Sequence, residues 1–343
     1  RPPPPPAPPP RPPPRPRRPP PPPPPAPPGG GPPPPPPPPP AGPKKPRTAK
    51  RKRAANPLAN ETRFGYVFIS GYVLLLLAFG IIPTLYAVFL SITRDGVFVG
   101  IDNFVRVFGD YRFLPAVGHV TLYIVFWLIS LIVLVTFLAI IVHSIRAKWL
   151  SVSIRFLYYI PGAIAGASSV MLWLFLLDPT VSPVAGLLRA MGYDSLIRTV
   201  SIDNLPIVFT VIAFWTGAGS WIVIMYGALN NISNEVIEAA RVDGANPLQV
   251  ALYIQLPMMT KWISYMGIMS LAAGTQLFVE PRVLSQASRG VVPEDYSLNQ
   301  LAYLYAFKQG DFSGSAAISI TLLVVALALS TVFILKGKLF ERD

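Results

Sequence analysis

Polar and aromatic residues interrupt two long apolar runs in the second half of the chain, and their chemistry suits contact with a solute. Indole rings, amides, hydroxyls and carboxylates can contact a polar molecule by stacking on it and by hydrogen bonding. Polar groups are costly in lipid and therefore tend to face a protein interior or a pathway. Five residues are the candidates for a solute pathway: Trp215, Ser220 and Trp221 in the run 206–229, and Gln276 and Glu280 in the run 262–284.

The same residues have a simpler interpretation as membrane-interface residues. Glu280 would then lie at the membrane surface and pair with Arg282, and the tryptophans would anchor their helices at headgroup level. The sequence leaves both interpretations open.

No catalytic or metal-binding set is visible. The chain has no cysteine, and its two histidines, His119 and His143, lie near the ends of apolar runs, where we interpret them as interface residues. The pattern G-x-x-x-x-G-K-[ST], which cradles nucleotide phosphates, does not occur. We therefore predict a non-catalytic chain with no metal or cofactor of its own.

Composition indicates a membrane protein. Of 343 residues, 52% are hydrophobic and only 13% are charged, against about 25% in a soluble domain. Mean hydropathy is +0.47. The net charge of +13 belongs to the first 53 residues, which hold 12 basic residues and no acidic ones and leave 17 basic against 16 acidic residues elsewhere. A folded basic face for nucleic acid is therefore not indicated.

The elements that must position these residues are apolar runs of membrane length. They predict an all-α fold of six transmembrane helices, and Gly162 and Gly166 repeat at a spacing typical of close helix packing. The basic residues before the first run favour a cytoplasmic N-terminus, and six crossings return the C-terminus to the same side. The predicted spans are about 64–90, 117–143, 156–177, 206–229, 262–284 and 316–335.

One polar stretch, residues 233–257, predicts two short helices that meet at a corner. Ser233 or Asn234 can cap the first helix, and Gly244 can end it because glycine accepts the left-handed conformation. Asn246 can cap the second helix, with Pro247 in its first turn and Gln249 at a capping-box spacing. We expect Pro257 to end this helix.

This stretch resembles the EAA loop, E-A-A-x-x-x-G followed by I-x-L-P, of membrane subunits of bacterial ABC importers, and D-G-A resembles the carbohydrate-uptake branch. The resemblance implies a coupling helix that docks into a cleft on an ATPase subunit. It also implies a complex of this permease, a second permease, two ATPases that bind ATP and Mg²⁺, and an extracytoplasmic solute-binding protein. The coupling residues are Glu238, Ala239, Ala240, Asp243, Gly244, Ile254, Leu256 and Pro257.

Weaker matches to the same family lie on both sides of the loop. Gly100–Phe104 resembles the G-[LI]-x-N-F segment that follows the first span, and 276–285 resembles the F-x-x-P-x-x-L-[TS] segment. The loop 178–205 departs from the family, because it lacks the usual G-x-x-N turn, and the glycine pair that commonly follows Ser285 is missing.

Residues 1–53 hold 32 of the 43 prolines and end in a basic cluster, Lys44–Arg53. Proline runs can form polyproline II but no packed core. We predict a disordered cytoplasmic tail over 1–53 and a permease domain over 54–343. A ligand for proline-binding domains and a basic anchor for lipid headgroups are the alternatives for the tail.

Together these patterns predict a permease subunit of an ATP-driven, binding-protein-dependent importer in the bacterial inner membrane. The expected solute is a sugar, an oligosaccharide or a polyol derivative. One alternative is a secondary transporter, which would need acidic residues within the membrane and an inverted repeat. The other is a membrane scaffold that recruits partners through its proline-rich tail.

Overall fold

The computed structural model describes residues 57–164 and 166–336, and within them the regular structure is helical apart from one two-stranded sheet. The predicted all-α class is confirmed. Internal contacts divide the chain into Arg1–Arg63 and Phe64–Asp343, and the second unit is the subject below. The predicted tail and the C-terminal residues 337–343 lie outside the described residues, so the boundary after residue 53 stays a prediction.

Four continuous helices in the described part of the chain are long and apolar enough to cross a bilayer, which needs about 20 residues. They cover Phe68–Ser91, Phe113–Ser144, Leu205–Asn230 and Phe312–Leu335. Their elements are α1 (Pro57–Leu76), η1 (Leu77–Ile81) and α2 (Ile82–Ser91); α4 (Phe113–Ser130), η2 (Leu131–Val135) and α5 (Thr136–Ser144); α10 (Leu205–Asn230); and α17 (Phe312–Lys336).

The two remaining predicted spans are bent pairs of helices. α6 (Lys148–Tyr159) with η3 (Ile160–Ala163) is followed by α7 (Gly166–Leu177) at an angle of 103°. α14 (Thr260–Gly274) is followed by α15 (Val279–Ala287) at 43°. The third span is therefore not the single run 156–177 that we predicted. The span begins earlier, at Lys148, and Pro161 and Gly162 interrupt it. The prediction missed its first part because residues 148–155 are amphipathic and do not form a continuous apolar run.

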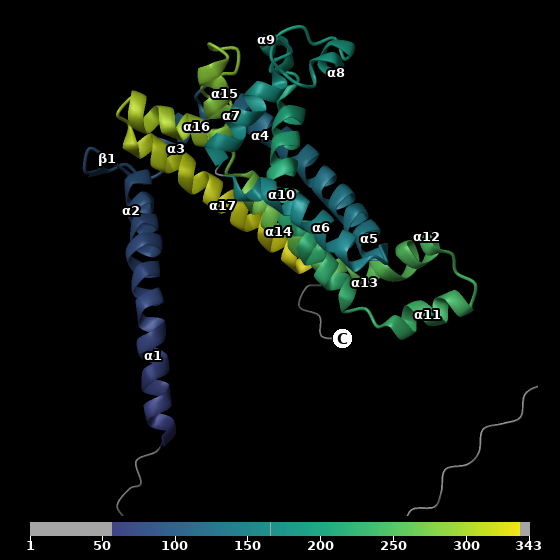
Figure 1. Ribbon diagram of the computed structural model, residues 1–343. Coiled ribbons are helices and arrows are strands. Elements are labelled where there is room, and N and C mark those ends of the chain that lie inside the picture. The colour runs from purple at the N-terminus through teal and green to yellow at the C-terminus, as the bar shows by residue number, and fades with distance from the viewer. Residues whose placement is uncertain (1–56, 165, 337–343) are drawn as a thin grey trace, which may run out of the picture. The chain divides into compact units, whose positions relative to one another are not determined.

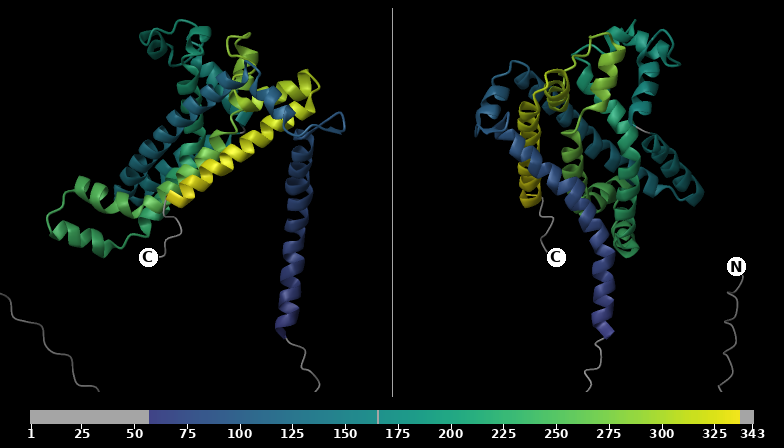
Figure 2. Two further views of the ribbon diagram at one scale, coloured as in Figure 1. Left: turned by 180° about the vertical axis from the view of Figure 1, so that it is seen from behind. Right: turned by 90° about the vertical axis from the view of Figure 1, so that its left-hand side faces the viewer.

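Helix α10 lies at the centre of the bundle and packs against α4, α5, α6 and η3 (Figures 1 and 2). Its buried side chains include Phe209, Ile222 and Met225. Glycine lets two backbones meet at the break in the third span: a Cβ on Gly219 would lie 2.0 Å from the carbonyl oxygen of Tyr158, and one on Gly162 would lie 2.8 Å from that of Thr216. The close packing predicted at Gly162 is thus confirmed, and its partner is α10.

Short elements join the spans. Between the first two spans, β1 (Thr93–Arg94) pairs with β2 (Val97–Phe98) through a turn with positive φ at Asp95 and Gly96, as two-residue hairpins require. The other connections hold α3 (Asp102–Phe108), α8 (Ala185–Ala190), α9 (Leu196–Thr199), α16 (Leu298–Tyr303) and η5 (Leu304–Lys308).

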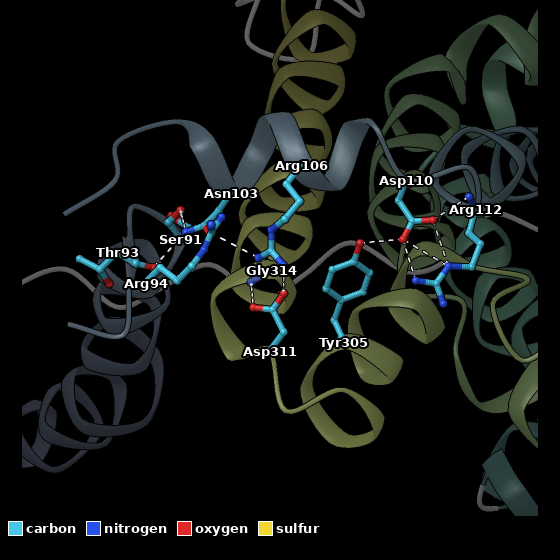
Figure 3. A network of polar contacts seen from close by, with 10 residues as sticks. All are labelled: Ser91, Thr93, Arg94, Asn103, Arg106, Asp110, Arg112, Tyr305, Asp311 and Gly314. Carbon is cyan, nitrogen blue, oxygen red and sulfur yellow. Dashed lines mark hydrogen bonds and ion pairs between the residues drawn. The ribbon is translucent and has the colours of Figure 1, made fainter. Parts of the chain in front are cut away.

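A buried asparagine ties the hairpin to α3 (Figure 3). Asn103 is fully buried, and its Nδ2 donates to the carbonyl oxygens of Ser91 at 3.0 Å and Thr93 at 2.9 Å. Its Oδ1 accepts from Nη2 of Arg94 at 2.8 Å. Asn103 therefore joins the end of α2, the hairpin and α3, which explains the role of the asparagine in the Gly100–Phe104 segment.

The same cluster reaches the start of α17. Arg106 pairs with Asp311 at 2.5 Å, and the other oxygen of Asp311 accepts the backbone N–H of Gly314, which caps α17. The hydrogen bonds from Arg106 and Gly314 hold the pKa of Asp311 below its usual range despite partial burial. Nearby, Tyr305 donates to Asp110, and burial together with this bond raises the pKa of Tyr305 to about 12.

Replacing Asn103 by alanine is expected to lower the free energy of unfolding by about 2 to 4 kcal/mol, because buried carbonyl groups lose their donors. Thermal unfolding of the purified chain measures the change. Asn231→Ala is the matched control, since Asn231 is exposed at the end of α10 and should change stability by no more than about 0.5 kcal/mol. Equal stability of the two variants would contradict the conclusion that the hydrogen bonds of Asn103 hold α2, the hairpin and α3 together.

Candidate functional site

The candidate coupling loop begins as the sequence predicts. Helix α11 (Asn234–Val242) is capped by Ser233, whose hydroxyl accepts the backbone N–H of Glu235 at 3.2 Å. Glu235 lies in the first turn, where the helix dipole favours negative charge. Ile237 is buried and anchors the helix to the bundle core. The opposite face of α11 is exposed, so the helix is held by one side only.

Gly244 forms the corner with φ of +88°. The N–H of Gly244 bonds to the carbonyl of Arg241 at 3.1 Å, and the N–H of Ala245 bonds to that of Ala240 at 2.9 Å. This pair of bonds is a Schellman motif, in which the left-handed residue is usually glycine. The two alanines, Ala240 and Ala245, pack against the bundle core. The corner is therefore fixed by backbone geometry and by small side chains.

The second helix also begins as predicted. Asn246 and Gln249 form a reciprocal capping box, with bonds of 2.9 and 2.8 Å, and α12 (Pro247–Val250) follows. The helix continues through η4 (Ala251–Gln255) into α13 (Leu256–Met258), so it ends one residue after the predicted Pro257. Proline lacks an N–H and crowds the carbonyl four residues earlier, and the wider π-turn of η4 just before it accommodates both effects.

The loop presents an exposed surface at the end of the bundle where α17 finishes, opposite α8, α9 and α15 (Figures 1 and 2). Three apolar side chains stand out there: Val242, Tyr253 and Leu248 are 87%, 76% and 66% exposed. Between the corner at residues 243–245 and the helix formed by α12 and η4 lies a hollow of about 320 Å³. Of the predicted coupling residues, Ala240, Ile254 and Leu256 are half-buried, and the exposed ones are Glu238, Ala239, Asp243, Gly244 and Pro257.

The candidate solute residues do not form one cluster. Trp215 meets Trp173 of α7 edge to face, with ring centroids 5.8 Å apart, and both line an apolar hollow beside α6. Trp221 meets Tyr265 of α14 in the same way at 5.9 Å. Ser220 is exposed on another face of α10. The structure therefore places the three α10 candidates on different faces of that helix.

The two candidates from the fifth span lie at its bend. Gln276 is exposed in the break between α14 and α15, and Glu280 is half-buried in the first turn of α15. The pairing of Glu280 with Arg282 is wrong for the residues that the structure describes. The guanidinium of Arg282 lies over the ring of Tyr303 instead, 4.8 Å from its centroid.

Both histidines pack on aromatic rings. The ring of His119 stacks on Tyr296 with centroids 4.4 Å apart, and His143 meets Tyr226 edge to face at 5.5 Å. Within residues 57–164 and 166–336, no group of three or more histidine or acidic side chains could hold a metal ion.

Sequence reasoning missed three structural residues: Trp173, Gly219 and the half-buried Tyr158. A lone tryptophan or glycine in an apolar run carries no signal of its partner. The partners lie on other spans, so only the assembled bundle reveals them.

Curated proteins of similar sequence are transport permeases, although no protein-family model matches the chain. The probable ABC transporter permease protein YurN of Bacillus subtilis is 28% identical over 77% of this chain and 92% of its own length. The arabinooligosaccharides transport system permease protein AraP of Halalkalibacterium halodurans is 25% identical over 77% and 84%. The sn-glycerol-3-phosphate transport system permease protein UgpA of Escherichia coli is 26% identical over 81% and 95%.

A solved structure has the same fold. The crystal structure of a bacterial ABC transporter involved in the import of the acidic polysaccharide alginate includes a chain that matches with a TM-score of 0.73 at 18% identity, over 82% of this chain and 98% of that one. The chain described here is a multi-pass membrane protein with the permease fold of ABC importers. Its homologues are permeases of ABC and sugar transport systems, so the resemblance found in the sequence is confirmed.

Proposed function

We propose that the chain is the membrane-spanning subunit through which an ATP-driven importer passes a sugar, an oligosaccharide or a related polyol derivative. The observation that carries the proposal is the loop 233–257 at one end of the permease fold. Its two helices are capped by their own side chains and its corner is a glycine with positive φ. A loop of that length with so many local bonds is a rigid docking element and not a flexible connection.

The docking partner is an ATPase subunit, on which ATP and Mg²⁺ would bind. Glu238 and Asp243 would supply the charged contacts, and exposed Val242 and Tyr253 the apolar ones. An apolar centre with a polar rim is typical of protein interfaces. The permease itself would hydrolyse nothing, as expected from homologues that are transport permeases.

A second permease and a solute-binding protein complete the complex. The exposure of the first span supports the presence of a second permease, because no residue in the most apolar part of Phe68–Ser91 is buried within this chain. Large apolar side chains such as Phe79 and Tyr86 are 79% and 60% exposed. A structural neighbour was solved in complex with an alginate pentasaccharide-bound periplasmic protein, which supports a binding protein at the end opposite the coupling loop.

The solute pathway would run along faces that a second permease closes. Ser220 and Gln276 are polar and exposed at membrane depth, so we assign them the most direct contacts with solute hydroxyls. Trp221 of α10 and Glu280 of α15 would contribute further contacts beside them. Trp215 is a weaker candidate, because the hollow that it lines is apolar.

The orientation and the coupling role can be tested together, because the chain has no cysteine. The test needs exposed positions at the two ends of the bundle. We expect Asp243→Cys to react with an impermeant maleimide only from the cytoplasmic side, and the ATPase subunit to protect it.

Asp194→Cys is the control at the other end, where the Asp194 side chain is 70% exposed. It should react from outside intact cells whether or not the ATPase is present. Labelling of Asp243→Cys in intact cells, or full reactivity in the presence of the ATPase, would contradict the proposal.

A further inference from the structure

Helix α6 presents a wide apolar face that nothing in the described chain covers. Trp149, Val152, Phe156, Leu157 and Ile160 recur at the spacing of one helix face, and all are exposed, Trp149 by 72% and Phe156 by 66%. The opposite side of α6, at Ser151 and Tyr158, packs on α5 and α10. In a membrane protein such a face borders lipid or another subunit.

Basic residues gather where this face begins. Arg146 and Lys148 are exposed at the start of α6, next to Trp149, and neither has an ion pair among the residues that the structure describes. Tryptophan beside lysine or arginine is typical of the headgroup level of a bilayer. The third basic residue, Arg155, is engaged elsewhere, because its guanidinium stacks 3.8 Å from the ring centroid of Tyr226.

The other end of the face opens into a hollow. It has a volume of about 510 Å³ and lies where the third span breaks and bends away beside α10. Leu157 of α6 and Ile160 of η3 form one wall, and Val211 and Trp215 of α10 form another. The walls are almost entirely apolar, which excludes a sugar and suits a hydrocarbon chain.

The distance between the basic residues and the hollow matches one leaflet. Lys148 and Ile160 are twelve helical positions apart, which corresponds to about 18 Å. Half of a hydrocarbon core is about 15 Å thick. A lipid whose phosphate lies at Arg146 and Lys148 would therefore place the end of an acyl chain in the hollow.

We propose that this face is a binding site for one anionic phospholipid, with its headgroup at Arg146 and Lys148 and an acyl chain along α6 into the hollow beside α10. The site lies at the coupling-loop end of the bundle, so its assignment to the cytoplasmic leaflet rests on the proposed orientation. Binding itself requires neither ATP nor solute.

Native mass spectrometry of the full chain tests the site with added phosphatidylglycerol or phosphatidylcholine of equal chain length. We expect one phosphatidylglycerol to be retained in preference to phosphatidylcholine. Arg146→Gln with Lys148→Gln should reduce that preference on the order of tenfold, because each basic residue near the surface attracts anionic lipid. Arg198→Gln with Arg289→Gln removes the same charge from exposed positions near the other end of the bundle and should leave the preference unchanged.

Two variants on α10, one that lines the hollow and one that does not, test the role of the hollow. Val211 and Val223 are 43% and 39% exposed, but only Val211 lines the hollow. Val211→Trp should fill the hollow and weaken retention of both lipids severalfold. Val223→Trp should bind both lipids as the unmodified chain does.

Several outcomes would overturn the proposal. They are equal retention of the two lipids, a preference that survives loss of Arg146 and Lys148, and equal effects of the two tryptophan variants. Retention by the isolated chain but not by the assembled importer would show that a second permease covers the face, and would overturn it too. A failure of the import function would leave these binding results unchanged, so the two proposals are tested separately.

Discussion

Gly244→Asp is expected to abolish solute uptake while leaving the amount of membrane-inserted protein unchanged. A non-glycine residue in the left-handed region costs about 1 to 2 kcal/mol, which a chain of six spans tolerates. Apart from its chain neighbours, no atom lies within 4 Å of a Cβ built on Gly244, so the new side chain points into space that the proposed ATPase partner would occupy. A second carboxylate beside Asp243 would then be desolvated at the interface, which costs several kcal/mol. Association with the ATPase should fall at least about 100-fold.

Gly192 offers a matched control for the backbone effect. It has φ of +89° and ends α8 with the same pair of bonds, from Gly192 to Arg189 and from Tyr193 to Leu188. Gly192→Asp should therefore lose as much thermal stability as Gly244→Asp and still bind the ATPase normally. Equal loss of ATPase binding in both variants would mean that folding, not docking, causes the defect.

Glu238→Lys should resemble Gly244→Asp in its effect on transport but not on stability. Glu238 is exposed on α11, so reversing its charge leaves the fold intact and changes only what the partner meets. The measurement is ATPase activity of the purified complex with and without loaded binding protein. If loaded binding protein stimulates the ATPase activity of this variant as much as that of the unmodified complex, Glu238 is not part of the coupling surface.

Among the glycines that the structure describes, Gly219 is expected to show the largest effect on folding when it is replaced by alanine, because its added Cβ makes the shortest contact. The new Cβ would lie 2.0 Å from the carbonyl oxygen of Tyr158 and 2.8 Å from Cα of Tyr159. Both are backbone atoms, so the clash is relieved only if α6 moves away from α10. We expect a loss of at least about 3 kcal/mol and little protein at the correct size in gel filtration.

Gly227→Ala is the control on the same helix, since nothing lies within 4 Å of its Cβ. Alanine favours a helix over glycine by about 0.5 to 1 kcal/mol, so this variant should be as stable as the unmodified chain or slightly more stable. Normal yield and thermal stability of Gly219→Ala would contradict the close backbone contact between α6 and α10.

The structure of the candidate coupling loop, residues 233–257, was predictable because its determinants are local. Ser233, Gly244, Asn246 and Gln249 act on backbone groups within a few residues, so their spacing in the sequence carries the structure. The second helix ends at Met258, one residue after the predicted Pro257. The π-turn that widens the helix before the proline was not predicted, because nothing in the local pattern distinguishes it from an ordinary α-helical turn.

Features that depend on contacts between spans were harder to predict. The six spans follow from hydropathy, but the 103° bend of the third does not. The bridging bonds of Asn103 join residues up to twelve positions apart through a hairpin. The solute candidates were chosen by residue type alone, and the structure sets Trp215, Ser220 and Trp221 on separate faces because successive helix positions turn by about 100°.

Uptake into proteoliposomes tests the central claim most directly. Vesicles would hold the chain assembled with its second permease and ATPases, with binding protein and labelled solute outside. We predict accumulation that requires ATP inside and binding protein outside, and that is absent with Gly244→Asp. Accumulation driven by a proton or sodium gradient without ATP would contradict the account and favour a secondary transporter.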